Sequence, residues 1–184
     1  MHAGAPSDLS LSLVVFILLV FLRAGGHKLF DFAVFTGYVA DYRIIPERFL
    51  SVACGVLVVA ELLVVLLQVV PGGRIFGLAL GGGLLTAYAF GMAVNIVRGH
   101  TDIECGCGGA VQRLSWSLVI RNCLLMAIIG VAMAYPSHGF DAFSSGIAVL
   151  SGVSFWIVFL LAEQILANSS LARLTRQDGG FVRT

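Results

Sequence analysis

The sequence contains few charged residues. Asp, Glu, Lys and Arg make up 11% of its 184 residues, against roughly 25% in soluble domains. Hydrophobic residues make up 59%, and the mean hydropathy is +0.99. A soluble chain of this length has too small an interior to bury so much apolar surface. We therefore predict one membrane-embedded domain, covering residues 1–184, that crosses the bilayer several times.

Other absences exclude further classes of protein. The net charge is only +1, and no basic run is interleaved with aromatic residues, so nothing indicates a nucleic-acid partner. Four cysteines are too few and too scattered for a disulfide-stapled scaffold. We find no Ser-His-Asp arrangement, phosphate-binding glycine loop or Cys-x-x-Cys-His haem motif. No Lys or Arg precedes Leu9, so we expect the first apolar stretch to be an uncleaved helix and not a signal peptide.

Five apolar stretches are long enough to span a bilayer, which takes about 20 residues. Helices are favoured because an open sheet edge does not occur in hydrocarbon. The stretches run approximately over Leu9–Gly26, Phe49–Val70, Ile75–Val97, Ser115–Tyr135 and Ala142–Ala167. The predicted fold is therefore an all-α polytopic membrane helix bundle with four core transmembrane helices and a fifth.

Residues 27–48, between the first two predicted spans, form a separate pattern. Apolar residues recur there at helical spacing, with charged residues between them. The pattern predicts a short amphipathic helix at the membrane interface, ending before Pro46. A plain connecting loop is the alternative.

Ionisable residues interrupt the apolar spans. Glu61 lies in the middle of the second span, and Arg121 lies about two turns into the fourth, followed by Asn122. Such groups are costly in a membrane and face a partner or a wet cavity. We expect Glu61 to pair with Arg121, either as a structural pair or as a polar pocket that serves proton transfer or a quinone headgroup. Glu163, near the end of the fifth span, is expected to be an interfacial anchor.

Cys105 and Cys107 lie in a polar break between the third and fourth spans, with one glycine between them. A disulfide closed over one residue forms a strained ring, which makes it labile and oxidising. The spacing favours a redox-active pair. A structural disulfide, idle thiols, or a metal clip with His100 are the alternatives, although no second Cys/His cluster completes a tetrahedral site. Cys54 and Cys123, inside spans, are expected to act as small hydrophobes.

Several blocks of residues carry a resemblance to a known family. They are His27–Phe32, Tyr42–Pro46, Glu61–Leu63, Asn95–His100 with Asp102–Gly109, Ser115-Trp116 and Arg121-Asn122. The sequence resembles the MauE family of methylamine utilisation membrane proteins, within the wider DoxX-like membrane family. The resemblance covers about residues 15–130.

The resemblance implies a role in maturation, processing or transport of the disulfide-rich small subunit of methylamine dehydrogenase. Cys105 and Cys107 would exchange disulfides with a thioredoxin-like MauD-type partner, while Glu61 and Arg121 would tune a pocket. No metal or cofactor is expected in this interpretation. One alternative is a non-enzymatic scaffold or transport factor for that subunit. Another is a quinone-linked disulfide oxidase, similar to vitamin K epoxide reductase but with Cys-x-Cys in place of Cys-x-x-Cys.

The orientation in the membrane is a point of conflict. In a five-span arrangement, Arg74 is alone on one side. The positive-inside rule would place the opposite, more basic side in the cytoplasm, together with the cysteine pair. The family resemblance instead implies an inner-membrane protein with a periplasmic cysteine pair, because oxidative chemistry takes place there; we adopt this second orientation. The basic residues on the cysteine side are Lys28, Arg43, Arg48, Arg98, Arg113, Arg173, Arg176 and Arg183.

Overall fold

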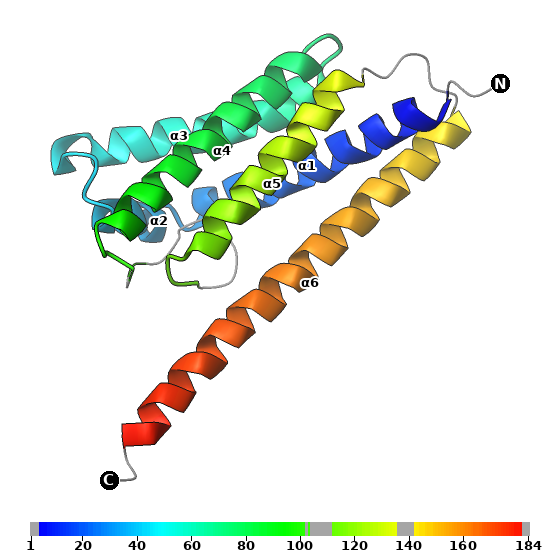
Figure 1. Cartoon of the computed structure of the whole chain (residues 1–184). Helices are drawn as coiled ribbons and strands as arrows, with labels where there is room; N and C mark the ends of the chain where they lie inside the picture. The colour runs from blue at the N-terminus through cyan, green and yellow to red at the C-terminus, as the bar shows by residue number, and fades with distance from the viewer. Residues whose placement is uncertain (1–3, 102, 104–111, 136–141, 182–184) are drawn as a thin grey trace.

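The computed structural model describes residues 4–101, 103, 112–135 and 142–181, and the side chains of residues 8–101, 103, 112–135 and 145–169. Six helices form in the described part (Figure 1). Every one except α2 contains a stretch long and apolar enough to cross a membrane. The prediction of an all-α, multi-pass membrane protein is therefore confirmed. The helices are α1 (Gly4–Phe30), α2 (Phe32–Asp41), α3 (Glu47–Val69), α4 (Arg74–Val97), α5 (Trp116–Ala134) and α6 (Ala142–Phe181).

α1 runs through the middle of the bundle and packs on α3, α5 and α6. It continues to Phe30, four residues beyond the predicted end at Gly26. Gly25 packs closely on α3, because a Cβ atom there would lie 3.3 Å from the Glu61 Cβ atom, tighter than ordinary contact. Gly25 therefore allows close helix packing and does not end the helix. As a consequence, Lys28 belongs to the spanning helix.

The core lies where α1, α3, α4 and α5 meet. Ile17 and Phe21 of α1 are almost completely buried there, against Val64 of α3 and Leu78 of α4. Gly81 of α4 makes room for the Phe21 ring, because a Cβ atom at position 81 would lie 3.1 Å from it. Small residues on α4 thus bring the helix axes close together, as is typical of membrane bundles.

α2 lies in the segment for which the sequence predicts a short amphipathic helix. Its Phe35 is buried against Cys54 and Val58 of α3. The chain then turns at Arg43, which has a left-handed backbone (φ 51°), before α3 begins after Pro46. The location of α2 at the membrane interface stays a prediction.

α6 packs chiefly on α1 and extends well past the ends of the other helices (Figure 1). The two helices touch most closely at Gly152, where a Cβ atom would lie 2.7 Å from both the Ser12 carbonyl oxygen and the Val15 Cβ atom. This contact aligns α6 along α1. It also brings Glu163, three turns further along α6, beside the bundle.

Candidate functional site

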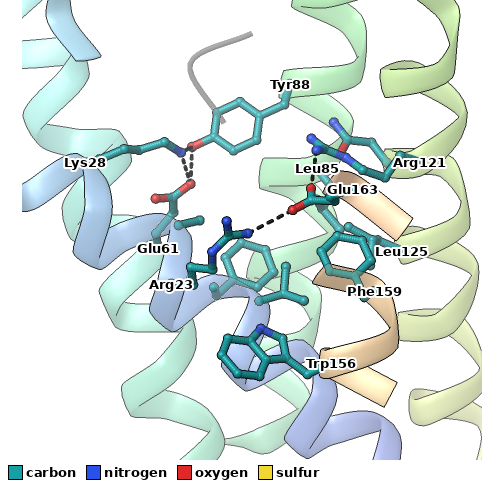
Figure 2. Close-up of a pocket in the computed structure, with 14 residues that line it drawn as sticks. Arg23, Lys28, Glu61, Leu85, Tyr88, Arg121, Leu125, Trp156, Phe159 and Glu163 are labelled. Carbon is teal, nitrogen blue, oxygen red and sulfur yellow. Dashed lines mark hydrogen bonds and ion pairs between the residues drawn. The ribbon is translucent and has the colours of Figure 1, made fainter. Parts of the chain in front are cut away.

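A small cavity inside the bundle is lined by five charged side chains and has a volume of about 50 Å³ (Figure 2). On one side, Glu61 of α3 is 1% exposed and forms an ion pair with Lys28 of α1, which is 3% exposed. Tyr88 of α4 donates a hydrogen bond to the same Glu61 oxygen, with 2.7 Å between the two oxygens. The Lys28 ammonium also lies 4.6 Å from the centre of the Tyr88 ring. Three helices are thus joined by one carboxylate.

The other side of the cavity is organised around Glu163 of α6. Its two carboxylate oxygens bind different cations: Arg23 of α1 at 2.8 Å and Arg121 of α5 at 2.6 Å. The Gln112 side chain, just before α5, donates a hydrogen bond of 3.0 Å to the Glu163 backbone oxygen. Glu163 therefore connects α1, α5 and the end of the segment that precedes α5.

The predicted pairing of Glu61 with Arg121 is wrong, although both residues line the same cavity. Glu61 instead pairs with Lys28, and Arg121 pairs with Glu163. The prediction of Glu163 as an interfacial anchor is also wrong, because this residue is 6% exposed and bound by two guanidinium groups. Both differences have a structural cause: α1 continues past Gly26 and includes Lys28, and α6 packs along α1 and brings Glu163 beside Arg23 and Arg121.

A signal in the sequence could have located Lys28. Phe21, Gly25 and Lys28 follow one another at intervals of four and three residues, which places them on one face of a helix. Phe21 and Gly25 are apolar or small, so this face is the one that packs on neighbouring helices. A lysine on it requires a buried acid, and Glu61 is the acid near the middle of the next span.

A second, larger cavity of about 220 Å³ lies between α2, α3 and α4. It shares Lys28 and Tyr88 with the first cavity, and its other lining is mainly aromatic or aliphatic. Tyr42 borders it, outside the spanning segments, and burial raises the pKa of its phenol to about 12. The Tyr42 hydroxyl therefore stays protonated at neutral pH. The remaining lining residues are Phe35, Tyr38, Val39, Ile44, Ile45, Leu57, Ala87, Gly91 and Met92.

Cys105 and Cys107 lie outside the described residues, but both ends of their segment are described. The Leu114 amide donates a 3.0 Å hydrogen bond to the Ile103 carbonyl, and Leu114 is buried in a cluster with Met92. Gln112 contacts the Glu163 backbone, as described above. The described residues on either side of the cysteine segment (residues 104–111) are therefore bonded to each other and to α6: Leu114 to Ile103, and Gln112 to Glu163.

The two other cysteines and the metal interpretation can be compared with the structure in part. Cys54 is completely buried against Phe35, in agreement with its expected role as a small hydrophobe, whereas Cys123 lies on the exposed surface of α5. No group of three His, Cys, Asp or Glu side chains suited to a metal ion occurs among the described residues. The metal clip involving His100 depends on thiols outside these residues and stays untested.

The family model of the methylamine utilisation protein MauE matches residues 7–135. The chain belongs to the MauE family. The MauE protein of Paracoccus denitrificans is 32% identical over 166 residues, which cover 88% of this chain and 89% of that protein. The MauE protein of Methylorubrum extorquens is 36% identical over 66% of this chain and 67% of that protein. The one from Methylophilus methylotrophus is 27% identical over 81% of both chains.

No solved structure matches the chain significantly. The MauE family match spans α1 to α5 and ends at Tyr135, before α6 begins. It therefore includes Arg23, Lys28, Glu61 and Arg121, which are four of the five charged residues that line the first cavity. Only Glu163 comes from beyond the matched residues.

Proposed function

We propose that this MauE-family protein is an accessory membrane protein of methylamine utilisation that promotes maturation of the disulfide-rich small subunit of methylamine dehydrogenase by thiol-disulfide exchange. Its relatives are named methylamine utilisation proteins. One structural observation supports the site: the residues that flank the cysteine segment are held in place, Leu114 by Ile103 and Gln112 by Glu163, which lines the buried charged cavity. Fixed flanks would restrict where the two thiols meet a partner.

The proposed exchange conserves electrons and protons. Two thiols of the client reduce a Cys105–Cys107 disulfide through a mixed disulfide, so that the client gains a disulfide and the protein gains two thiols. A thioredoxin-like MauD-type partner then accepts the two electrons and two protons, and its own disulfide is reduced to two thiols.

Glu61 and Arg121 act indirectly in this proposal. Arg121 holds Glu163, whose backbone oxygen binds Gln112, just before α5. Glu61 pairs with Lys28 on the other side of the same cavity and stabilises the contact of α1 with α3.

The protein resides in the cell inner membrane, and the cysteine segment faces the periplasm in this proposal. The distribution of basic residues in the sequence favours the opposite orientation. One of those residues, Lys28, is buried in an ion pair with Glu61, and a neutralised charge within a span contributes little to the loop charge bias that orients membrane proteins. The client is periplasmic, where disulfides persist.

Replacing Cys105 or Cys107 with Ser is expected to abolish maturation of the small subunit, because either change removes half of the exchanging pair. The measurement is the amount of mature, active dehydrogenase in cells that carry the complete pathway, alongside the amount of variant protein in the membrane. Cys123→Ser is the matched control and should mature the subunit normally, since Cys123 is an exposed residue of α5 and is not part of the proposed pair. Normal maturation in both test variants would contradict the exchange mechanism.

One labelling assay measures both the redox state of Cys105 and Cys107 and the side of the membrane on which they lie. In a Cys54→Ala, Cys123→Ala background, a mass-tagged maleimide that does not cross membranes should label Cys105 and Cys107 in spheroplasts only after reduction. Labelling only in inverted vesicles would overturn the periplasmic orientation. A pair whose redox state never changes would instead support the non-enzymatic scaffold or transport factor.

The second cavity supports a further candidate, a quinone-linked disulfide oxidase. It has a volume of about 220 Å³ and an apolar, aromatic lining, with Lys28 and Tyr88 as polar groups at the boundary with the charged cavity. A quinone bound there would take two electrons and two protons from the Cys105/Cys107 dithiol and become a quinol. The protein's own contribution would be a hydrogen bond from the Lys28 ammonium to the quinone oxygen, with Tyr88, whose hydroxyl donates to Glu61, lining the same boundary.

Filling this cavity distinguishes the two candidates. A Phe at Gly91 would occupy the space between Tyr42 and Ile44, whose nearest atoms lie 3.9 and 3.8 Å from a Cβ atom at position 91. In the quinone mechanism, Gly91→Phe slows reoxidation of the dithiol in isolated membranes by tenfold or more, on the order of one lost binding interaction, while Gly91→Ala is unaffected. Equal reoxidation rates in wild type and Gly91→Phe would eliminate the quinone candidate.

A further inference from the structure

The cavity between the two ion-paired clusters has an excess of positive charge. Its described lining contains three cations, Arg23, Lys28 and Arg121, but only two carboxylates, Glu61 and Glu163. With each group in its ordinary ionic form, the net charge is +1. All five groups belong to membrane-spanning segments, where an uncompensated charge is costly. Lys28 and Glu61 neutralise each other, so the excess lies on the side of Arg23, Arg121 and Glu163.

The same cavity contains more unused hydrogen-bond donors than acceptors. Three buried donor atoms have no partner among the described residues: Arg121 Nε, Asn122 Nδ2 and Trp156 Nε1. Asn122 is only 2% exposed. One buried acceptor atom, Glu61 Oε2, also has no hydrogen-bond partner among the described residues. All of these residues line the cavity, and Figure 2 shows the nitrogen of the Trp156 ring on the side that faces the charged groups.

Water and an anion would satisfy these groups differently. A water molecule fits a polar cavity of this size and accepts hydrogen bonds, but it leaves the excess charge uncompensated. A charge without a counter-charge is costly inside a membrane span, and Arg121 is only 16% exposed. An anion accepts hydrogen bonds from the free donors and neutralises the charge at the same time. The volume of about 50 Å³ suits a small inorganic anion.

We propose that the cavity binds one small inorganic anion of the chloride type, held by the charge of Arg23 and Arg121 and by donors that include Asn122. The site is separate from the exchange chemistry of Cys105 and Cys107, and its test does not depend on that function. The role of the anion is to balance the positive charge of the ion-paired cluster in which Glu163 of α6 binds Arg23 of α1 and Arg121 of α5. Among the described residues, Glu163 pairs with both arginines and supplies one negative charge against their two positive charges.

The test compares chloride with gluconate, a bulky organic anion, at constant ionic strength on the purified full-length protein. Chloride at ten times its dissociation constant should raise the folding equilibrium constant about elevenfold. This corresponds to an increase in Tm of about 3 °C or more for a chain of this length. In a Trp116→Phe background, where Trp156 is the one remaining tryptophan, chloride should also change the indole fluorescence in a saturable manner.

Charge variants at Arg23 make the test specific. Arg23→Gln lowers the net charge of the cavity to zero and leaves the Arg121–Glu163 pair in place, so the chloride response should disappear. Arg23→Lys keeps the charge and should retain the response. Because Arg23 is about one-third exposed, both variants should fold, and their Tm in gluconate verifies this. Asn122→Leu provides a second test and should weaken the response.

Two outcomes would overturn the proposal. The first is an equal Tm of the wild type in chloride and gluconate, which would mean that water or a group outside the described residues completes the cavity. The second is a wild-type chloride response in Arg23→Gln, which would place the responding site elsewhere in the protein.

Discussion

Replacing Glu61 with Ala is expected to destabilise the protein by about 3–5 kcal/mol, the usual cost of removing one partner of a buried ion pair. The change leaves the Lys28 ammonium buried without a counter-charge and removes the acceptor of the Tyr88 hydroxyl. Contacts of the ammonium with the rings of Phe35 and Tyr88, at 5.1 and 4.6 Å, offset only part of this loss. The measurement is thermal unfolding in detergent, together with the yield of folded protein from membranes.

Two control variants show whether the loss of stability in Glu61→Ala comes from the unpaired Lys28 charge or from lost side-chain packing. The Lys28→Met, Glu61→Leu double variant removes both charges and keeps most of the volume, so it should recover most of the lost stability. Glu61→Gln keeps an acceptor for Tyr88 and should be intermediate. If Glu61→Ala is as stable as the wild type, the Lys28–Glu61 pair does not hold α1 against α3. If the double variant is no more stable than Glu61→Ala, the loss comes from packing and not from an unpaired charge.

Gly152→Val is the second change with a large expected effect. The new side chain would meet the Ser12 carbonyl oxygen and the Val15 side chain of α1 at about 2.7 Å for its Cβ atom alone, so the helices must separate. We expect a loss of at least about 1–3 kcal/mol, as for overpacking in a core. Displacement of α6 also withdraws Glu163 from Arg23 and Arg121. Maturation of the client should therefore fall together with Tm.

The matched control lies on the same helix. A Cβ atom at Gly146 meets nothing within 4 Å, so Gly146→Val carries the same change in helix propensity without the clash. It should unfold near the wild-type temperature. A similar Tm for both valine variants would show that α6 does not depend on close packing at Gly152.

The prediction of the spans from hydropathy succeeded because a stretch of about 20 apolar residues has few alternatives to a spanning helix. The segment with Phe32 to Asp41 was also predicted as a short helix, and α2 forms there. The residue blocks that indicate the family, from His27 to Asn122, all lie within the residues 7–135 that the MauE family model matches. Glu61 and Arg121 were selected because ionisable groups in a span are rare, and both line one buried cavity.

The partners of these charges could not be predicted in the same way. Lys28 follows two glycines and belongs to residues 27–48, which the pattern predicts as a separate amphipathic helix, yet α1 continues through Lys28 while Gly25 packs closely against Glu61 and Leu62. Glu163 lies near the end of an apolar stretch, and its burial depends on how α6 crosses α1 at Gly152. Neither contact is a property of a single segment.

The sequence by itself determined the class of protein, its membrane spans, its family and the rare residues on which function is proposed to depend. Apolar length and composition act locally, so they can be read segment by segment. Only the tertiary structure decided which charges meet: Lys28 with Glu61, and Arg23 and Arg121 with Glu163. The reason is that ion pairing within a bundle depends on helix rotation and crossing point, which are set by side-chain packing between segments far apart in the chain.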